Sequence, residues 1–136
     1  MTAMTPADLL DEARELMART DSVTAGIWPR TSALLTRQAL EQAVRSRWAA
    51  LPDTAGLAFA SMRSQLICLP CYLDVATAEQ VAYVWAALSG ACHYHPYELA
   101  PTAAELTGWI GDVERLITQV GCAAYTPPKR DSDASL

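Results

Sequence analysis

Helix-start signals divide this chain into five stretches of helical character, and their spacing limits the folds that it can adopt. Thr5 followed by Pro6 places a good N-cap before a proline at the first helical position, and Pro29 opens a second apolar stretch. Two segments, Thr77-Ala78-Glu79-Gln80 and Thr102-Ala103-Ala104-Glu105, fit the capping-box pattern. With the apolar residues that follow at helical spacing, these signals predict helices over about 6–19, 29–50, 54–69, 77–95 and 102–120.

The composition favours an all-α domain. The chain holds 25 Ala but only 4 Trp, 5 Tyr and 1 Phe, and it lacks the excess of Val, Ile and Thr that is typical of strands. A length of 136 residues with 51% hydrophobic residues suits one core. We therefore expect a single α-helical domain over residues 1–125. The segment 126–136, rich in Pro, charge and Ser, predicts a disordered C-terminal tail.

Short connections predict the topology. Pro52-Asp53-Thr54 should end the second helix and cap a third, with apolar residues inside at Leu57, Phe59, Met62, Leu66 and Leu69. Successive helices joined by short loops are antiparallel, so we expect an up-down antiparallel bundle of four main helices plus one. In such a bundle the end of the second helix, the start of the third and the end of the fourth share one end.

Charge and hydropathy argue against two classes of protein, although a local basic patch remains open. A net charge of −5 weighs against a chain that wraps a nucleic-acid backbone, because that affinity comes from many Lys and Arg contacts with phosphate. No apolar stretch reaches the length of a membrane span, and the first residues lack the basic and apolar regions of a secretion signal. We expect a cytoplasmic protein without a membrane partner.

One group of cysteines and histidines resembles a zinc site by its residue types. Cys68 and Cys71 precede the fourth predicted helix, and Cys92, His93 and His95 follow it. If residues 77–93 form one helix, the two groups lie roughly 25 Å apart, which is too far for one ion. We therefore expect neither a metal nor another cofactor.

A thiol cluster is the remaining alternative. Cys122, at the end of an antiparallel fifth helix, should fall back near Cys68 and Cys71. Three buried cysteines that pack as small apolar residues are the simpler interpretation.

The turn after the fourth predicted helix holds the densest polar chemistry. His93, His95 and Glu98 are candidates for general acid–base catalysis, and Tyr94 and Tyr97 are candidates for ligand binding. The alternative is structural: the His and Tyr rings fill the corner and hydrogen-bond the carbonyls at the helix end.

The arginines suggest an anion site. The predicted topology brings Arg45 and Arg47, with Trp48 and Asp53, to the same end as the histidines, so that a cationic rim could bind a phosphate. Arg63, in the middle of the third predicted helix, is a third candidate ligand-binding arginine. Its side chain should either reach solvent or pair with an acid across the bundle.

A second set of arginines follows one face of the second predicted helix. Arg30, Arg37 and Arg45 lie close to one face, with Glu41 between the last two. This pattern is typical of a solvated ion-pair ladder rather than of a nucleic-acid contact.

Three helical segments and the turn together resemble a known family. The segments 34–41, 62–69 and 85–95, with Glu98-Leu99-Ala100-Pro101-Thr102, look like an actinobacterial branch of the HEPN superfamily over roughly residues 6–120. The resemblance implies a small α-helical bundle, often dimeric, in toxin–antitoxin, defence or stress systems. It also implies that many members are metal-independent ribonucleases or bind RNA or nucleotides.

The chain departs from the family at its nuclease motif, which is an Arg, four to six residues and then a His. The Arg that belongs with His93 would stand five to seven positions before it, where this chain has Ala86, Ala87 and Leu88. The Arg that belongs with His95 would stand where the chain has Leu88, Ser89 and Gly90. Family analogy therefore supports the fold better than the activity.

We accordingly expect a non-catalytic binding module for RNA, a nucleotide or a partner protein, as a homodimer or heteromer. Apolar residues left over on the second and third predicted helices would form the protein-binding face. The alternative is a metal-independent ribonuclease that uses His93 or His95 with a spatially adjacent Arg45, Arg47 or Arg63.

Overall fold

The structure is a computed structural model that describes residues 3–19, 26–93 and 95–122. The described residues form the α-helices α1 (Pro6–Ala18), α2 (Trp28–Ala50), α3 (Met62–Cys68), α4 (Val75–Cys92) and α5 (Ala103–Cys122), and the 3₁₀ helices η1 (Ala55–Phe59) and η2 (Leu69–Cys71). None of them lies in a β-strand. The all-α prediction is confirmed.

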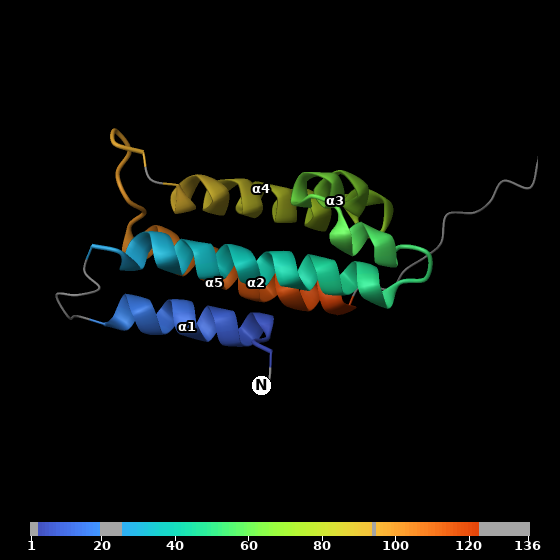
Figure 1. Cartoon of the computed structure of the whole chain (residues 1–136), viewed down its shortest axis with the longest axis horizontal. Helices are drawn as coiled ribbons and strands as arrows, with labels where there is room; N and C mark the ends of the chain where they lie inside the picture. Colours follow the sequence, from blue (N-terminus) through green and yellow to red (C-terminus); the bar gives the residue numbers. More distant parts are fainter. Residues whose placement is uncertain (1–2, 20–25, 94, 123–136) are drawn as a thin grey trace, which may run out of the picture.

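Four helices form the bundle, and α2 lies at its centre. Helix α2 packs against α1, α4 and α5, while the shorter α3 lies beside one end of the bundle (Figure 1). The core between them consists of apolar side chains that are almost fully buried: Leu10, Leu40, Val44, Trp48, Val84, Leu88, Leu106, Ile110 and Val113. The bundle of four main helices plus one is therefore confirmed. No helix of the described segments is long and apolar enough to cross a bilayer.

Close packing of α1 on α2 depends on small polar residues. Ser32 and Thr36 are fully buried on α2. The Ser32 hydroxyl donates to the Ala13 carbonyl of α1 at 3.2 Å, and the Thr36 hydroxyl donates to the Ser32 carbonyl at 2.7 Å. These bonds satisfy the hydroxyls locally, so the two backbones approach closely without a buried polar group left unpaired.

Two of the predicted helix starts are confirmed and one is wrong. Thr5 caps α1 in a capping box with Asp8, and the Thr102 hydroxyl accepts from the Glu105 backbone N–H at 3.2 Å. Helix α4, however, begins at Val75, because the Asp74 carboxylate accepts from the Thr77 backbone N–H at 3.0 Å. The Thr77 hydroxyl itself donates to Asp74 at 3.0 Å, so the residue predicted as the N-cap lies inside the helix.

The third predicted helix, over 54–69, is interrupted. Ala60 ends η1 in an extended conformation, and Ser61 then caps α3 by accepting from the Ser64 backbone N–H at 3.2 Å. Serine competes with the helical backbone for hydrogen bonds, which makes it a weak interior residue and a strong N-cap. The break leaves Phe59, predicted to be inside, 92% exposed.

The side chain of Gln65 holds the interrupted segment against α2. Gln65 is fully buried. Its amide nitrogen donates at 2.8 Å to the carbonyl of Ala60, which lies at the break between η1 and α3. Its oxygen accepts from the indole nitrogen of buried Trp48 on α2 at 3.1 Å. Trp48 also meets Tyr72 edge-on, with ring centroids 5.2 Å apart. Residues 51–74 therefore fold back beside the end of α2 instead of running the length of the bundle.

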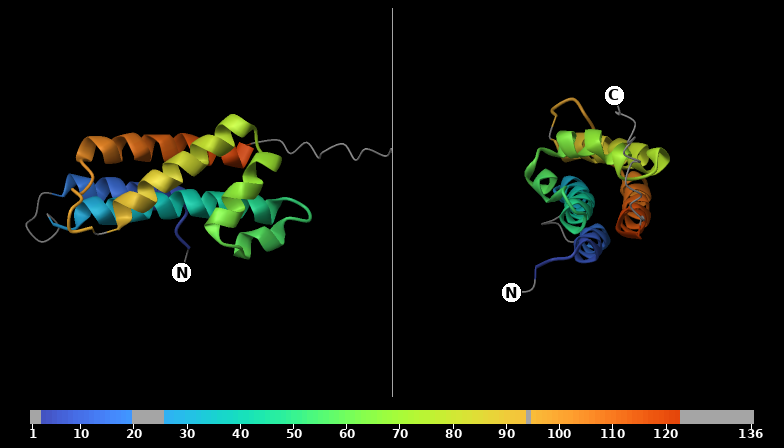
Figure 2. Two further views of the ribbon diagram at one scale, coloured as in Figure 1. Left: turned by 90° about the horizontal axis from the view of Figure 1, so that it is seen from above. Right: turned by 90° about the vertical axis from the view of Figure 1, so that its right-hand side faces the viewer.

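This fold-back reverses the expected direction of α4. Helix α4 starts near the end of α2 and finishes near its start, so α4 runs antiparallel to α2 and crosses it obliquely (Figure 2). The predicted third helix ran the full length of the bundle. In that arrangement the fourth helix starts at the opposite end from the end of α2, and α4 would be parallel to α2. The predicted disordered tail at 126–136 lies outside the described residues.

The first prediction concerns Gln65. Gln65→Met should lower the free energy of unfolding by roughly 2–4 kcal/mol, because the Trp48 indole N–H and the Ala60 carbonyl lose buried partners. Chemical denaturation measures the change. Gln38→Met, at an exposed site on α2, is the matched control and should change little. A Gln65→Met variant as stable as the control would contradict this role.

The second prediction concerns pH. Hydrogen bonds from the Thr77 hydroxyl and backbone N–H hold the pKa of the Asp74 carboxyl below its ordinary value. The stability that this carboxylate contributes is therefore present above its unfolded pKa and is lost as the pH falls through its lowered folded pKa. Asp74→Asn keeps a capping oxygen but cannot titrate, so its stability should fall less than that of the wild type between about pH 5 and pH 2. Denaturation curves across this range test the difference, and parallel curves would show that the carboxylate has no such role.

Candidate functional site

The turn between α4 and α5 carries the predicted catalytic candidates on its surface. His93, His95 and Glu98 are exposed, and Tyr97 is 98% exposed. The Glu98 backbone N–H donates to the His95 carbonyl at 3.1 Å, which closes the turn through the main chain. Tyr94 lies outside the described residues. These exposed rings do not fill the corner of the bundle, so the structural alternative is wrong as stated.

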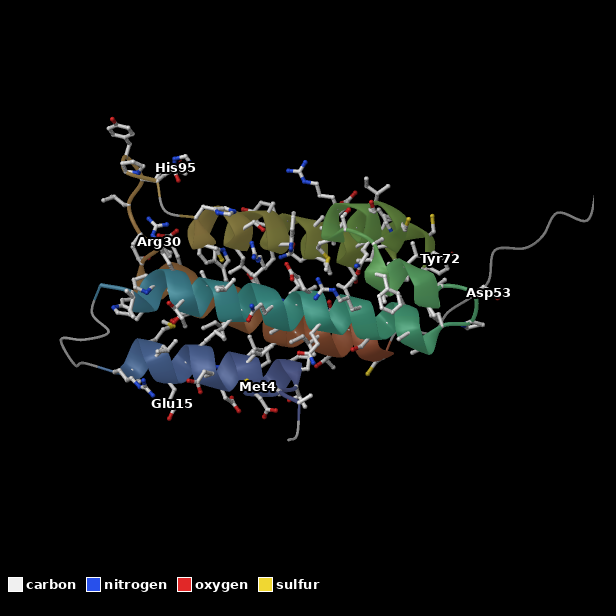
Figure 3. The ribbon with its side chains drawn as sticks, viewed as in Figure 1. Met4, Glu15, Arg30, Asp53, Tyr72 and His95 are labelled. Atoms are coloured by element: carbon white, nitrogen blue, oxygen red, sulfur yellow. The ribbon has the colours of Figure 1, made fainter. Side chains whose placement is uncertain are left out.

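Arg30 takes the structural role that was expected of the rings. Its guanidinium Nη1 donates to the Ala91 carbonyl at 3.4 Å and to the His93 carbonyl at the end of α4. Figure 3 shows Arg30 and His95 at the same end of the bundle. A cation near a helix C-terminus is favourable because the unpaired carbonyls there carry partial negative charge. Arg30 was visible in the sequence, but it lies on α2, 61 and 63 residues before the two residues whose carbonyls it bonds.

The predicted cationic rim is not assembled. Asp53 and Tyr72 lie at the opposite end of the bundle from His95 (Figure 3). Arg45 is 15 residues beyond Arg30 on α2, which corresponds to about 22 Å along the helix. Because α4 runs antiparallel to α2, its end meets the start of α2, and Arg45, Arg47 and Trp48 belong to the other half of that helix.

The three predicted ligand-binding arginines have different environments. Arg45 is exposed and pairs with Glu41, with Nη2 and Oε2 3.5 Å apart. Arg63 is exposed on α3, so it reaches solvent as one of the two alternatives predicted. Arg47, on α2, is the buried one of the three, and the burial of a charged side chain requires an explanation.

Glu41 joins α2 to α4, and the sequence analysis recognised only part of its role. The predicted ion pairs are present, with Arg37 and Arg45 3.4 Å and 3.5 Å from the Glu41 carboxylate, but that carboxylate is only 14% exposed, so the ladder is not solvated as predicted. In addition, the Trp85 indole nitrogen of α4 donates to Glu41 Oε1 at 3.0 Å. The carboxylate thus holds two arginines and an indole in place, and it leaves Arg37 and Arg45 less available for phosphate.

The sulfur groups do not converge. The continuous helix α4, 18 residues or about 27 Å long, separates Cys68 and Cys71 from Cys92, as predicted. Within the described segments no group of three or more His, Cys, Asp or Glu is placed to hold a metal ion. Cys71 and Cys122 are exposed, so the prediction of three buried cysteines is wrong for these two.

Cys92 is the most enclosed of the chemical groups near the turn. Burial raises the pKa of its thiol, an effect that neighbouring Glu41 reinforces and that Arg37 and Arg30 oppose. The sulfur is therefore a protonated thiol at neutral pH and a weak nucleophile.

One helix face stands out because it is exposed yet nearly uncharged. Helix α4 contains a single charged residue, Glu79. Its buried side is formed by Ala78, Val81, Val84 and Leu88. The exposed residues recur on the opposite side, and we call them the α4 outer face: Val75, Ala76, Glu79, Gln80, Tyr83, Ala86 and Gly90.

Comparison with protein-family models, curated proteins and solved structures finds no match to this chain. The resemblance to HEPN proteins therefore remains a prediction from the residues that carry it, and the candidate sites are assessed on their geometry.

The third prediction concerns the link between α2 and α4. Glu41→Ala should lower the free energy of unfolding by about 1–3 kcal/mol, because the Trp85 indole N–H loses its acceptor and the half-buried Arg37 loses its ion pair. Glu79→Ala removes the same atoms from an exposed position on α4 and should change stability by less than about 0.5 kcal/mol. Urea denaturation of both variants measures the difference, and equal effects would contradict the role of Glu41.

Proposed function

We propose that this chain is a non-catalytic, HEPN-like binding module of the bacterial cytoplasm that docks another protein chain on the α4 outer face. The first partner that we propose is a second copy of the chain itself. The assignment to a stress, defence or toxin–antitoxin system rests on the family resemblance alone.

The observation that carries the proposal is the α4 outer face. A helix on the surface of a small bundle normally presents charged residues to water, whereas a helix that is apolar all round is normally covered. Here Tyr83 is 70% exposed and Val75 is also exposed, with Ala76, Ala86 and Gly90 around them. Small residues allow another helix to approach closely, and tyrosine is enriched at protein interfaces.

The neighbouring segment adds apolar surface. Phe59 at the end of η1 is 92% exposed, and Ile67 on α3 is 78% exposed. The sequence had placed the partner face on its second and third helices. The structure covers α2 on several sides, so the proposal keeps the η1–α3 segment and replaces α2 with α4.

Electrostatics favour a protein partner over RNA. Four arginines, Arg14, Arg37, Arg45 and Arg115, pair with acidic side chains of the chain itself. An RNA backbone would have to compete with these carboxylates, and the net charge of −5 opposes its approach. A helix face with one carboxylate creates little repulsion between two copies.

The alternative proposal is a metal-independent ribonuclease. Exposed His93 and His95 could exchange protons with an RNA substrate. An arginine that contacts the end of α4 beside them is Arg30, whereas Arg45 and Arg47 lie toward the other end of α2. Because Arg30 donates to the carbonyls at the end of α4, this role would require it to leave them. We therefore favour the binding module.

The fourth prediction tests docking. Sedimentation equilibrium should show concentration-dependent dimers of the full chain, and Tyr83→Glu should shift the protein to monomer by placing a buried, unpaired charge in the interface. Ala7→Glu introduces the same residue at an exposed site on α1, on the other side of α2 from α4, and should leave the dimer intact (Figure 1). A wild-type chain that stays monomeric, or dimers that Tyr83→Glu does not weaken, would overturn the proposal of a second copy.

Incubation with total RNA in the presence of a chelator distinguishes the alternative. We expect intact RNA. Cleavage that disappears in the His93→Ala/His95→Ala double variant, with its circular dichroism spectrum unchanged, would favour the ribonuclease instead.

A further inference from the structure

Arg47 is a buried cation, and two of the three nitrogen atoms of its guanidinium lack a hydrogen-bond acceptor. The residue is only 9% exposed, and its Nε and Nη2 atoms are buried with no hydrogen-bond acceptor. No carboxylate of the described segments forms an ion pair with it. A buried guanidinium normally has a carboxylate or several carbonyls around it, because removing an unpaired charge from water is costly.

The position of Arg47 on its helix explains only part of this burial. Arg47 lies in the last turn of α2, where a positive charge interacts favourably with the helix dipole. That interaction supplies no acceptor for Nε or Nη2, which are adjacent donors in the planar fork of the guanidinium. The guanidinium therefore keeps hydrogen-bonding capacity that the described residues do not use.

A pocket of about 380 Å³ adjoins this side chain. Besides Arg47, its walls come from three helices: Pro6 of α1, Ala43, Ser46 and Ala50 of α2, and Ile117 and Gly121 of α5. Pro6 is the first residue of α1, so the positive end of that helix dipole also borders the pocket. The Asp8 carboxylate in the same turn is exposed and bonded to Thr5 within the capping box.

We infer that this pocket is a binding site for a small organic anion, with a carboxylate or phosphate group on Arg47 and an apolar body against the pocket walls. The planar guanidinium matches both oxyanions through paired N–H donors. Ala43, Ala50 and Ile117 provide apolar surface, and the Ser46 hydroxyl offers a further donor. The volume lies within the range of about 300–1,000 Å³ that is typical of small-molecule pockets.

Gly121 allows the pocket to be blocked without disturbing the helix. A Cβ atom built on Gly121 would meet nothing within 4 Å, so a larger side chain has room there. Methionine is also a better helix former than glycine. Gly121→Met should therefore fold normally while it fills space that the ligand body would occupy.

The experiment measures binding of three probes to the full chain at constant ionic strength. Phenyl phosphate and benzoate carry the two head groups on the same ring, and benzyl alcohol is the neutral analogue. Isothermal titration calorimetry should show saturable binding of at least one anion and none of the alcohol. The tighter anion identifies the preferred head group.

Two variants test the site, and a third is the control. Arg47→Met and Gly121→Met should each weaken binding of the anion at least about tenfold, the effect expected when a charge-assisted pair or its pocket is lost. Arg45→Met removes an exposed arginine two residues away and should leave the Kd within about twofold. If Arg47→Met does not fold, Gly121→Met carries the test.

Melting temperatures supply a second measurement. The anion should raise the melting temperature of the wild type and of Arg45→Met but not of Gly121→Met. Anion binding that survives both pocket variants, or a wild type that binds neither anion, would overturn the inference. Arg47→Met should leave the dimer on the α4 outer face unchanged, so the two proposals fail separately.

Discussion

The buried side chain of Gln65 determines how the rest of the chain is arranged. By bonding the Trp48 indole on α2 and the Ala60 carbonyl released at the break before α3, it keeps residues 51–74 at one end of the bundle. A buried amide with satisfied donors and acceptors specifies one geometry, because each alternative would leave a polar group unpaired. Helix α4 must then start where α2 ends, and the two helices run antiparallel.

Antiparallel packing of α2 and α4 decides which chemical groups meet. It places Glu41 opposite the Trp85 indole, and it places Arg30 against the carbonyls at the end of α4. The same arrangement leaves His93 and His95 exposed, with Arg45 and Arg47 toward the other end of α2. The end of α4 is thus stabilised by an arginine, while the imidazoles are exposed and lie outside the packed core.

Two features of the molecule are costly unless something covers or binds them. The α4 outer face exposes Tyr83 and Val75 on a helix with one charged residue, and Arg47 buries a guanidinium without an acceptor. Exposure of apolar side chains to water is unfavourable, and another protein surface would cover them. Burial of a cation without an acceptor is also unfavourable, and a bound anion would stabilise it. The two features lie on different helices, and we propose a different partner for each.

The sequence by itself determined the all-α class, the presence of the four main helices and the N-caps of α1 and α5. These follow from local chemistry, such as the Thr5 and Thr102 caps, which acts within a single turn. The direction of α4, the burial of Arg47 and the meeting of Arg30 with the end of α4 were decided only by the tertiary structure. The direction of α4 and its meeting with Arg30 depend on whether Ser61 interrupts a helix, and that choice is made by contacts of Gln65 with residues on another helix. The burial of Arg47 depends on how α2 packs against α1 and α5.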